Sequence, residues 1–359
     1  MSNDNNAVLI HFISHLKPGG AENRLVQYVN YKESCKHIII RLGLDVALEH
    51  KLNNLKSIWI LDLPKMIRVI FLLNKYKKKI LIGWQYHGAF LSIIFKLFCR
   101  NTSVIYYFHR EKVSIKYFKK STFLLAYITK LFENFASTKK IHCTEKGKKN
   151  HISFGFKSQN FLVVDNGFEI KGDVSKQASK KTKIIFISRD NKIKNNDLAF
   201  DIFHKTSKIH KDIELLVVGP DLDHNNKRLL LSIERFNEFK NIKLLGYKKN
   251  INEILKKVDI NLKTSLSEAF PLSIGESMIY GVPSVSTDVG SCKRIIGKTG
   301  KVFKNNDAKD GQKALTFLLD EKKNFPEKWE LRKELCRERI ISKFELYDSL
   351  NKLHKAFLK

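Results

Sequence analysis

Short apolar runs alternate along the chain with longer stretches in which apolar positions recur every three or four residues. The short runs are typical of buried parallel strands, and the periodic stretches are typical of helices that cover a sheet. The pattern predicts strands in the first half at 8–14, 36–42, 58–61, 80–84, 104–108 and 140–144. It predicts strands in the second half at 183–188, 214–218, 242–245, 258–262 and 283–286. After residues 300–303 the pattern is helical to the end of the chain.

The polar stretch 171–181, KGDVSKQASKK, separates these two alternations and indicates a linker. A length of 359 residues also fits two domains better than one. We therefore expect an α/β fold with one domain at 1–170 and a second at 182–335. Ligands of such folds bind at the carboxyl ends of the strands, which predicts a cleft between the two domains.

Cysteine content and apolar run length limit the cellular location. The five cysteines are scattered and have neither metal-ligand spacing nor a disulfide pattern, which fits a reducing cytosol. No basic segment precedes the first apolar run, as a secretory signal requires. The longest apolar stretch, 80–99, is interrupted by Gln85, His87 and Lys96, so we expect it not to span a membrane.

The chain is strongly basic, with 66 Lys and Arg against 36 Asp and Glu and a formal charge of +30. Between Lys65 and Asn150, 19 basic residues accompany three acidic ones and 16 of the 39 aromatic residues. Basic and aromatic residues together favour an anionic membrane surface, where lysines meet the lipid charge and rings lie among the headgroups. Nucleic-acid binding uses the same composition. A lysine-rich composition spread over an ordinary surface is a third explanation.

An apolar stripe at helical period runs through the same region and predicts a basic amphipathic helix from Val113 to Phe135. Lysines lie off the stripe, and further aromatic residues do too. Such a helix either packs on the core or docks on a membrane, and the sequence leaves both open. The stripe consists of Val113, Tyr117, Leu124, Ile128, Leu131 and Phe135.

Residues 264–290, TSLSEAFPLSIGESMIYGVPSVSTDVG, carry the chemistry expected of a phosphate-binding helix. Glu268 stands in the loop after a strand, and Pro271 starts a helix that contains Glu276. The first amides of that helix, at 272–274, have no intrahelical acceptors and lie at the positive end of its dipole. Glu276 would then accept hydrogen bonds from both hydroxyls of a ribose. The two glutamates also allow a second interpretation, the acid and nucleophile of a glycosidase, which the phosphate cradle makes less favourable.

This segment resembles the retaining glycosyltransferases of family 4, also called glycosyl transferases group 1, of the bacterial surface-polysaccharide type. Their signature is a glutamate, seven residues and a second glutamate, here from Glu268 to Glu276, followed by Gly281-Val282-Pro283 and Asp288-Val289-Gly290. The resemblance implies a GT-B fold of two facing Rossmann-like domains. It implies that Glu276 binds the donor ribose and that Glu268 lies near the transferred sugar. It also places the donor diphosphate on the segment formed by Phe270, Pro271, Leu272 and Ser273.

Other elements of the family pattern stand in the expected order. Gly19 and Gly20 match the N-terminal glycine loop that approaches the donor phosphates or the acceptor. Arg189 and Lys194 match the pair that neutralises the diphosphate leaving group. A histidine at a strand end contacts the donor sugar in this family, and we prefer His109 to His87 for it.

Three further positions concern the domain junction and departures from the family pattern. The segment 165–167, Asp-Asn-Gly, matches the turn at the domain junction, with Asp where the family often has Pro. Arg294 stands where many members have an acid, and 219–221, Gly-Pro-Asp, replaces a common Gly-x-Gly. These two departures leave donor contacts at those positions undefined.

The resemblance implies a hexosyltransferase that moves a sugar from a nucleotide diphosphate sugar to a lipid-linked glycan in O-antigen, capsule or lipopolysaccharide biosynthesis. It implies a peripheral enzyme on the inner face of the cell membrane, whose C-terminal helix at about 340–359 packs back on the first domain. No metal or other cofactor is expected, because Arg189, Lys194 and the helix amides face the leaving group. No nucleic acid is expected as a partner. The alternatives are a GT-B epimerase or phosphorylase and, less favoured, a basic nucleic-acid-binding protein.

Overall fold

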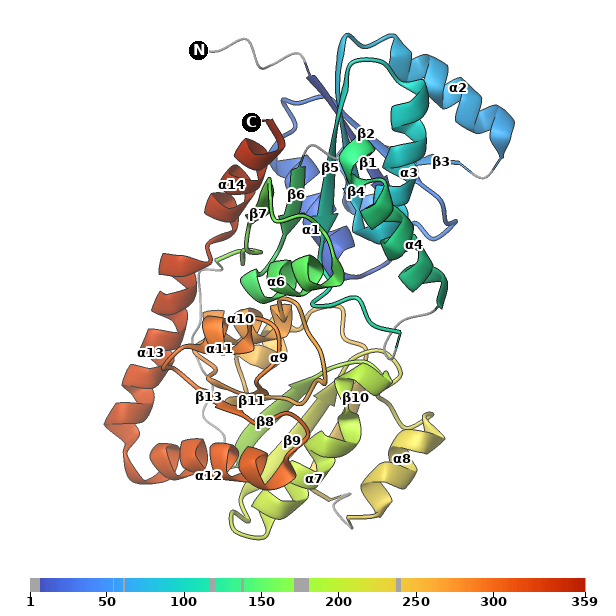
Figure 1. Ribbon diagram of the computed structural model, residues 1–359. Helices are drawn as coiled ribbons and strands as arrows, with labels where there is room; N and C mark the ends of the chain where they lie inside the picture. Colours follow the sequence, from blue (N-terminus) through green and yellow to red (C-terminus); the bar gives the residue numbers. More distant parts are fainter. Residues whose placement is uncertain are drawn as a thin grey trace. The chain divides into compact units, whose positions relative to one another are not determined.

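The protein is described here from a computed structural model, which covers residues 7–53, 55–60, 62–115, 120–136, 139–170, 181–236 and 240–358. The chain divides into two compact units (Figure 1). Unit 1 consists of Met1–Gly167 together with Leu346–Lys359, and unit 2 consists of Phe168–Glu345. The predicted linker at 171–181 lies outside the described residues, except for its last residue.

Unit 1 is built on a seven-stranded parallel sheet in the order β3-β2-β1-β4-β5-β6-β7. Six strands lie where the apolar runs predict them, and β7 was not predicted. The order reverses between β1 and β4, and ligands of open α/β sheets bind at the carboxyl side of such a reversal. The strands are β1 (Ala7–Ile13), β2 (His37–Arg41), β3 (Ile58–Trp59), β4 (Lys78–Trp84), β5 (Thr102–Phe108), β6 (Lys139–His142) and β7 (Phe161–Val163).

Helices cover both faces of this sheet, so its central strands are almost wholly apolar and buried. The helices are α1 (Gly20–Tyr31), α2 (Leu63–Asn74), α3 (Gln85–Phe98), α4 (Lys120–Leu131), α5 (Glu133–Ala136) and α6 (Glu145–Phe154), with a 3₁₀ turn at Glu49–Lys51. Local signals fix several helix ends. Asp62 caps α2 by accepting from the Lys65 amide at 2.7 Å, and Thr144 caps α6 by accepting from the Gly147 amide at 2.9 Å.

The last helix, α14 (Leu346–Leu358), belongs to unit 1 although it follows unit 2 in sequence. Its apolar face packs against α1, where the rings of Phe357 and Tyr28 lie 5.0 Å apart. Polar contacts fix its register: the Tyr28 hydroxyl lies 2.8 Å from His354 Nδ1, and Arg24 donates to Ser349 Oγ at 2.5 Å. These contacts make the C-terminus part of the first core.

Histidine rings form a neutral hydrogen-bonded chain through the core of unit 1. Trp84 Nε1 donates to His11 Nδ1 at 3.2 Å, so the proton of His11 lies on Nε2 and faces His37 Nδ1 at 3.1 Å. His37 Nε2 then donates to the Lys32 carbonyl at 2.9 Å. Each ring nitrogen is therefore fixed as either a donor or an acceptor. Protonation of either ring would bring two N–H donors face to face.

Two more buried histidines, His142 and His151, are held neutral in the same way. Each ring donates to a backbone carbonyl through one nitrogen and accepts a hydrogen bond at the other. Burial lowers the pKa of His142 to about 4 and that of His151 to about 3. The carbonyls are those of Arg110 and Gly147, and the donors are the Thr144 amide and the Tyr86 hydroxyl.

The predicted amphipathic helix from Val113 is wrong in its start. Residues 111–115 are not helical, 116–119 lie outside the described residues, and helix begins at Lys120. The face that packs inward carries Thr122, Ala126 and Thr129. Of the apolar stripe, Leu124, Leu131 and Phe135 are each more than half exposed, whereas Val113 packs against the hydrophobic core. The stripe is therefore divided between the core and the surface, and Tyr117 lies outside the described residues.

Unit 2 contains a six-stranded parallel sheet in the order β10-β9-β8-β11-β12-β13. Its strands are β8 (Thr182–Ile187), β9 (Ile213–Val218), β10 (Ile242–Gly246), β11 (Ile260–Lys263), β12 (Ser284–Thr287) and β13 (Lys301–Phe303). Its helices are α7 (Asn196–Ser207), α8 (Lys227–Glu234), α9 (Asn252–Leu255), α10 (Leu272–Ile279), α11 (Cys292–Ile296), α12 (Ala308–Asn324) and α13 (Pro326–Lys343), with a 3₁₀ turn, η3, at Lys192–Lys194. The edge strand β13 was not predicted.

Candidate donor site in unit 2

The carboxyl ends of β8 and β11 bring three polar side chains onto one carboxylate oxygen, Glu268 Oε1. Lys194 Nζ lies 2.5 Å from it and Lys263 Nζ lies 3.2 Å from it. Ser265 Oγ donates to the same oxygen at 2.8 Å. Lys194 comes from η3, directly after β8, while Lys263 is the last residue of β11. The loop that leaves β11 carries Ser265 and Glu268 back over these strand ends.

This arrangement fixes the charge of Glu268. Burial alone would raise the pKa of its carboxyl group, but Lys263 and Lys194 outweigh that effect and hold the pKa well below its usual range. Burial lowers the pKa of Lys194 to about 8, and the positive charges of Lys263 and Arg189 add to this, with Glu268 opposing them. A group that is always ionised cannot serve as a general acid, so within the glycosidase interpretation Glu268 could act only as the nucleophile.

Lys263 was missed by the sequence interpretation. A lysine at the end of an apolar strand usually reaches solvent, and nothing in its spacing indicates otherwise. Its side chain is nevertheless only 5% exposed. Its Nζ also lies 3.5 Å from the Ile187 carbonyl of the neighbouring strand β8. Only the folded register of β8 and β11 brings this amine to Glu268.

The turn at 288–290 supports the loop that carries Glu268. Thr287 Oγ1 donates to the Ser265 carbonyl at 2.7 Å, and the Ser291 amide donates to the Ala269 carbonyl at 2.9 Å. Gly290 has a φ of +53°, and a Cβ there would lie 2.0 Å from the Glu268 carbonyl oxygen. The glycine is therefore required both by its backbone conformation and by the close approach of the two loops.

Gly290→Ala should destabilise unit 2 by about 3 kcal/mol, because the methyl group forces the Glu268 loop away and the backbone remains strained. Urea unfolding measures this. Gly20→Ala is the control, since a Cβ at Gly20 meets nothing within 4 Å. Equal stability of the Gly290→Ala and wild-type chains would contradict this account of the turn.

Helix α10 begins where the sequence predicts, with Pro271 as its N-cap. The Ile274 amide bonds back to the Pro271 carbonyl at 3.2 Å, so of the three amides expected to bind phosphate only those of Leu272 and Ser273 remain. Ser273 Oγ is buried and has no hydrogen-bond partner among the described residues. A buried hydroxyl at a helix N-terminus without a partner indicates that a ligand atom belongs beside it. Glu276 lies half-buried one turn further along.

The side chain of Phe270 has a structural role. Its ring stacks on Phe168 at 5.7 Å between centroids and meets Phe344 edge-on at 6.0 Å. It is 7% exposed. The aromatic cluster fixes the chain just before α10, so the predicted contribution of Phe270 to donor binding is limited to its backbone. The Arg294 guanidinium lies 5.7 Å from the Phe344 ring at the edge of the same cluster.

Arg189 follows β8 and is exposed, and its positive charge helps to lower the pKa of Lys194. Five predicted donor-site residues of unit 2 therefore lie at the carboxyl ends of β8 and β11 or on the loops and helix that follow them. They are Arg189, Lys194, Glu268, Ser273 and Glu276. Within the described residues, no group of three His, Cys, Asp or Glu side chains has the geometry of a metal site. The role of each residue remains a prediction.

Gly19 and Gly20 lie in unit 1, where Gly19 is the N-cap of α1 and Gly20 is its first residue. A Cβ at Gly19 would meet the Glu22 carboxylate at 2.2 Å, so the missing side chain makes room for Glu22. The space beside Gly20 is open, and only this glycine leaves room for an approaching ligand.

His109 follows β5, and its ring stacks on Trp84 at 5.8 Å and lies 4.2 Å from the Tyr107 ring. Burial, with His142 and Arg24 nearby, keeps the pKa of His109 well below its ordinary value, so the ring is neutral at pH 7. Its Nε2 is buried and has no partner among the described residues. His109 thus has an unused hydrogen-bonding nitrogen, as the predicted contact with a sugar requires.

A second polar group lies at the carboxyl edge of the first sheet, and of its members only His87 was considered from the sequence. His15 Nδ1 lies 3.5 Å from Glu22 Oε1. Burial lowers the pKa of His87, and Arg110 and His15 lower it further. Three strand ends and the glycine loop therefore present polar and basic groups at the β1–β4 reversal. These residues are separated by up to 95 positions in the sequence, so no motif connects them.

The part of the chain that contains this site is similar to known proteins. Residues 168–335 match the family model described as Glycosyl transferases group 1. The capsular polysaccharide biosynthesis glycosyltransferase CapH of Staphylococcus aureus is 24% identical over 289 residues, which cover 78% of this chain and 81% of CapH. The chain is a glycosyltransferase.

Two further proteins resemble the glycosyltransferase. The N-acetyl-alpha-D-glucosaminyl L-malate synthase of Bacillus anthracis is 29% identical over 178 residues, covering 46% of this chain and 45% of that protein. HepE of Anabaena, solved in complex with UDP and glucose, superposes with a TM-score of 0.80 at 16% identity, covering 97% of this chain and 98% of HepE. The glycosyltransferase has the predicted GT-B fold, with two parallel-sheet α/β units. The family model and CapH favour transfer over the epimerase, phosphorylase and nucleic-acid alternatives.

Proposed function

We propose that this enzyme transfers a hexose from a nucleotide diphosphate sugar to a lipid-linked glycan, with retention of the anomeric configuration, in cell-surface polysaccharide biosynthesis. The observation that carries the proposal is the donor site of unit 2, where the Lys194–Glu268 pair lies in the segments before α10 and Glu276 lies one turn into that helix. The capsular function named for CapH and the UDP and glucose bound by HepE support the same substrate classes. O-antigen, capsule and lipopolysaccharide intermediates are the candidate acceptors.

The donor is held by groups that match its parts. The Leu272 and Ser273 amides and the unpartnered Ser273 hydroxyl bind the diphosphate at the positive end of α10. The Glu276 carboxylate accepts from the ribose hydroxyls. Arg189 and Lys194 face the charge that grows on the diphosphate as the bond to the sugar breaks, so their attraction is strongest in the transition state. The leaving group then needs no metal for this purpose.

The affinity for UDP should depend on pH through Lys194. Its pKa is about 8 in the free enzyme, and a bound diphosphate raises that pKa, so the complex holds more protons than the free enzyme does. Affinity is therefore full below about pH 8 and falls above it, by up to about tenfold per pH unit. Calorimetric titration of UDP between pH 7 and 9.5 measures this decline. Lys194→Met should abolish the break near pH 8, and a wild-type affinity that stays constant to pH 9.5 would exclude the role of Lys194.

The enzyme is further proposed to dock on the anionic inner face of the cell membrane. None of the helices in the described part of the chain combines the length and apolarity that a bilayer span requires. Helices α2, α3, α4 and α5 nevertheless expose an apolar surface, and α3 packs against α4. Asn74 joins the ends of α2 and α3 by donating to the Phe98 carbonyl at 3.0 Å. This docking surface consists of Leu63, Ile67, Phe71, Leu97, Phe98, Leu124, Leu131 and Phe135.

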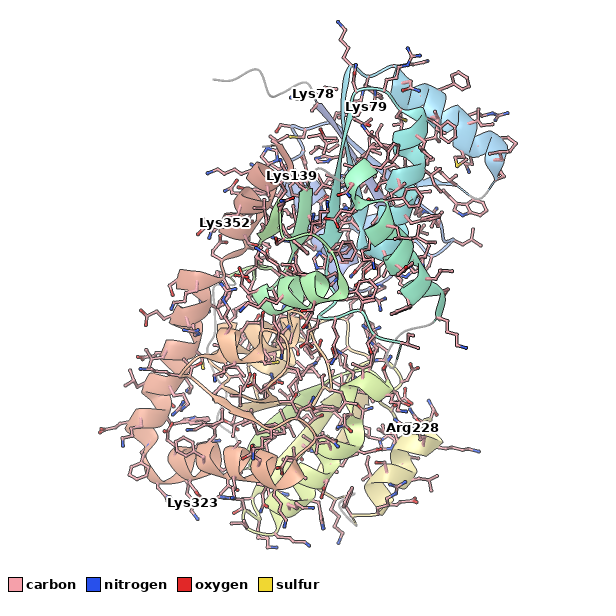
Figure 2. All side chains as sticks on the ribbon, in the orientation of Figure 1. Lys78, Lys79, Lys139, Arg228, Lys323 and Lys352 are labelled. Atoms are coloured by element: carbon pink, nitrogen blue, oxygen red, sulfur yellow. The ribbon has the colours of Figure 1, made fainter. Side chains whose placement is uncertain are left out.

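Charge makes an anionic bilayer the best-matched partner for this docking surface. Basic side chains occur on both units, with Lys78, Lys79, Lys139 and Lys352 on unit 1 and Arg228 and Lys323 on unit 2 (Figure 2). In unit 1, large exposed apolar side chains on neighbouring helices accompany the dense basic segment from Lys65 to Asn150. Phe71 is 70% exposed and Leu131 57%. Water contact at these side chains is costly, and insertion among headgroups removes it.

Phe71→Ser combined with Leu131→Ser should lower binding to phosphatidylglycerol vesicles about tenfold or more, because two large apolar side chains no longer enter the bilayer. Sedimentation with the vesicles measures this. Ile209→Ser in unit 2 is the matched control, since Ile209 is 60% exposed but lies outside the docking surface. Equal binding of the double variant and the control would contradict the assignment, as would equal binding to uncharged phosphatidylcholine.

Transfer itself is tested with labelled sugars. The purified enzyme is incubated with a bacterial lipid extract and a panel of UDP and GDP sugars carrying a labelled hexose. We expect one donor to label the lipid fraction, and we expect the anomeric proton coupling of the product to match that of the donor. Inverted configuration would contradict retention. Release of labelled sugar only into water, with every extract, would contradict the transfer to a lipid-linked acceptor.

A further inference from the structure

We propose that Lys263 is a positioning residue that permanently neutralises Glu268 and thereby frees Lys194 to move to the diphosphate of the donor. This inference rests on the proposed function. Lys263 is not among the site residues predicted from the sequence. The inference follows from the fact that the amines of Lys194 and Lys263 share one oxygen of Glu268.

The two lysines differ in how firmly they are held. Lys263 lies at the end of β11, where the strand pairs with β12, and its side chain is 5% exposed. Lys194 lies in the short turn η3 outside the sheet, and its side chain is 18% exposed. The amine on the strand therefore has little freedom, whereas the amine on the turn can move to a ligand.

Both lysines and Ser265 contact the same atom of Glu268. Lys194 Nζ lies 2.5 Å from Oε1, Ser265 Oγ lies 2.8 Å from it, and Lys263 Nζ lies 3.2 Å from it. If Lys194 moves to a diphosphate, Lys263 and Ser265 still hold Oε1. The carboxylate then keeps its orientation. Loss of the only cation beside a buried carboxylate would be strongly unfavourable, so a single lysine at this site would be retained by Glu268.

Electrostatics agree with this geometry. The positive charge of Lys263 is, after burial, the largest influence that lowers the pKa of Lys194. The charged groups that act on Glu268 are Lys194, from the turn after β8, and Lys263, from β11, with the neutral Ser265 and the buried Cys292 thiol of α11 nearby. The charge of Arg189 acts on Lys194. Lys263 therefore weakens the hold of Glu268 on Lys194 in two ways: it repels the second amine and it shares the carboxylate.

The test uses UDP as the probe and compares Lys263→Met, Glu268→Gln and the double variant with the wild type. Lys263→Met should lower UDP affinity at pH 7 about tenfold, because Lys194 becomes the sole counter-ion of Glu268. The break in affinity near pH 8 should also move to higher pH. In the Glu268→Gln background, Lys263→Met should have little further effect, since Lys263 acts through that carboxylate.

Lys243→Met is the matched control. Lys243 lies on strand β10, and its Nζ lies 2.7 Å from the Glu214 carboxylate. The substitution therefore removes a strand lysine and an ion pair outside the donor site. Melting temperature and circular dichroism report folding. If Lys263→Met does not fold, Lys263→Gln replaces it in the same comparison.

Two outcomes would overturn the inference. One is wild-type UDP affinity and an unchanged pH break in Lys263→Met. The other is an equal loss of affinity in the wild-type and Glu268→Gln backgrounds, which would mean that Lys263 contacts the nucleotide directly. Failure of the wild-type enzyme to bind any nucleoside diphosphate is a different result, since it would contradict the proposed function on which the inference rests.

Discussion

Replacing Lys194 by alanine is expected to lower kcat about 100- to 1,000-fold while changing the KM for the donor sugar much less. The diphosphate carries more charge as a leaving group than it does within the intact donor. A fixed cation therefore stabilises the transition state more than the bound substrate. Arg189→Ala should act in the same direction, and more weakly, because Arg189 is exposed to water whereas Lys194 is mostly buried.

Steady-state kinetics with the donor found in the transfer assay measure this difference. Lys192→Ala is the matched control, because Lys192 is an exposed lysine of the same turn η3. The control should keep wild-type kcat and KM. If Lys194→Ala raises KM as much as it lowers kcat, Lys194 binds the substrate and the transition state equally well, and its assignment to the leaving group is wrong.

Unit 1 is expected to lose its stability between pH 6.5 and about pH 4, while unit 2 remains folded over most of that range. The cause is a set of eight histidines whose pKa is lowered, chiefly by burial, and every one of them lies in unit 1. They are His11, His15, His37, His87, His109, His142, His151 and His354.

The sign follows from proton counts. In the unfolded chain these rings bind protons below about pH 6.5, but in the folded unit they stay neutral, so acid favours the unfolded state. The four most buried rings, His11, His37, His142 and His151, would together give a slope of about 5 kcal/mol per pH unit. In unit 2 the lowered pKa of carboxyl groups such as Glu268 matters only below about pH 4.5.

Hydrogen exchange measured at several pH values, and corrected for the intrinsic rate at each pH, separates the two units. Peptides from β1, β4 and β6 should lose protection at pH 5, and peptides from β8, β9 and β11 should keep it. Each unit is the control for the other within one sample. Equal protection of both units at pH 5 would contradict the account of neutral buried histidines.

The alternation of strands and helices was predictable because each buried strand is a short apolar run and each covering helix has an apolar face. The strands β7 and β13 were missed for a physical reason. Each contributes only three residues at a sheet edge, where one neighbouring strand suffices, so neither needs a long apolar run. The helix predicted from Val113 was wrong at its start because apolar periodicity carries no information about where helix begins without a cap.

The candidate site was predictable where the chemistry is local in sequence. Glu268, Pro271 and Glu276 lie within one strand–loop–helix segment, so spacing alone relates them. Lys263 was not predictable as a partner of Glu268, because its inward orientation depends on the pairing of β11 with β8. The space at Gly19 was assigned to a ligand, but the Glu22 side chain of the next helical turn fills it.

Thermal stabilisation by nucleotides tests the central claim most directly, namely that unit 2 binds a nucleotide diphosphate at α10 through Glu276. The wild type, Glu276→Ala and the control Glu253→Ala, an exposed acid on α9, are each melted with UDP, GDP, CDP and ADP and with their sugars. The account predicts that one nucleotide class stabilises the wild type and the control and does not stabilise Glu276→Ala. No stabilisation of the wild type by any of them at millimolar concentration, or equal stabilisation of Glu276→Ala, would contradict it.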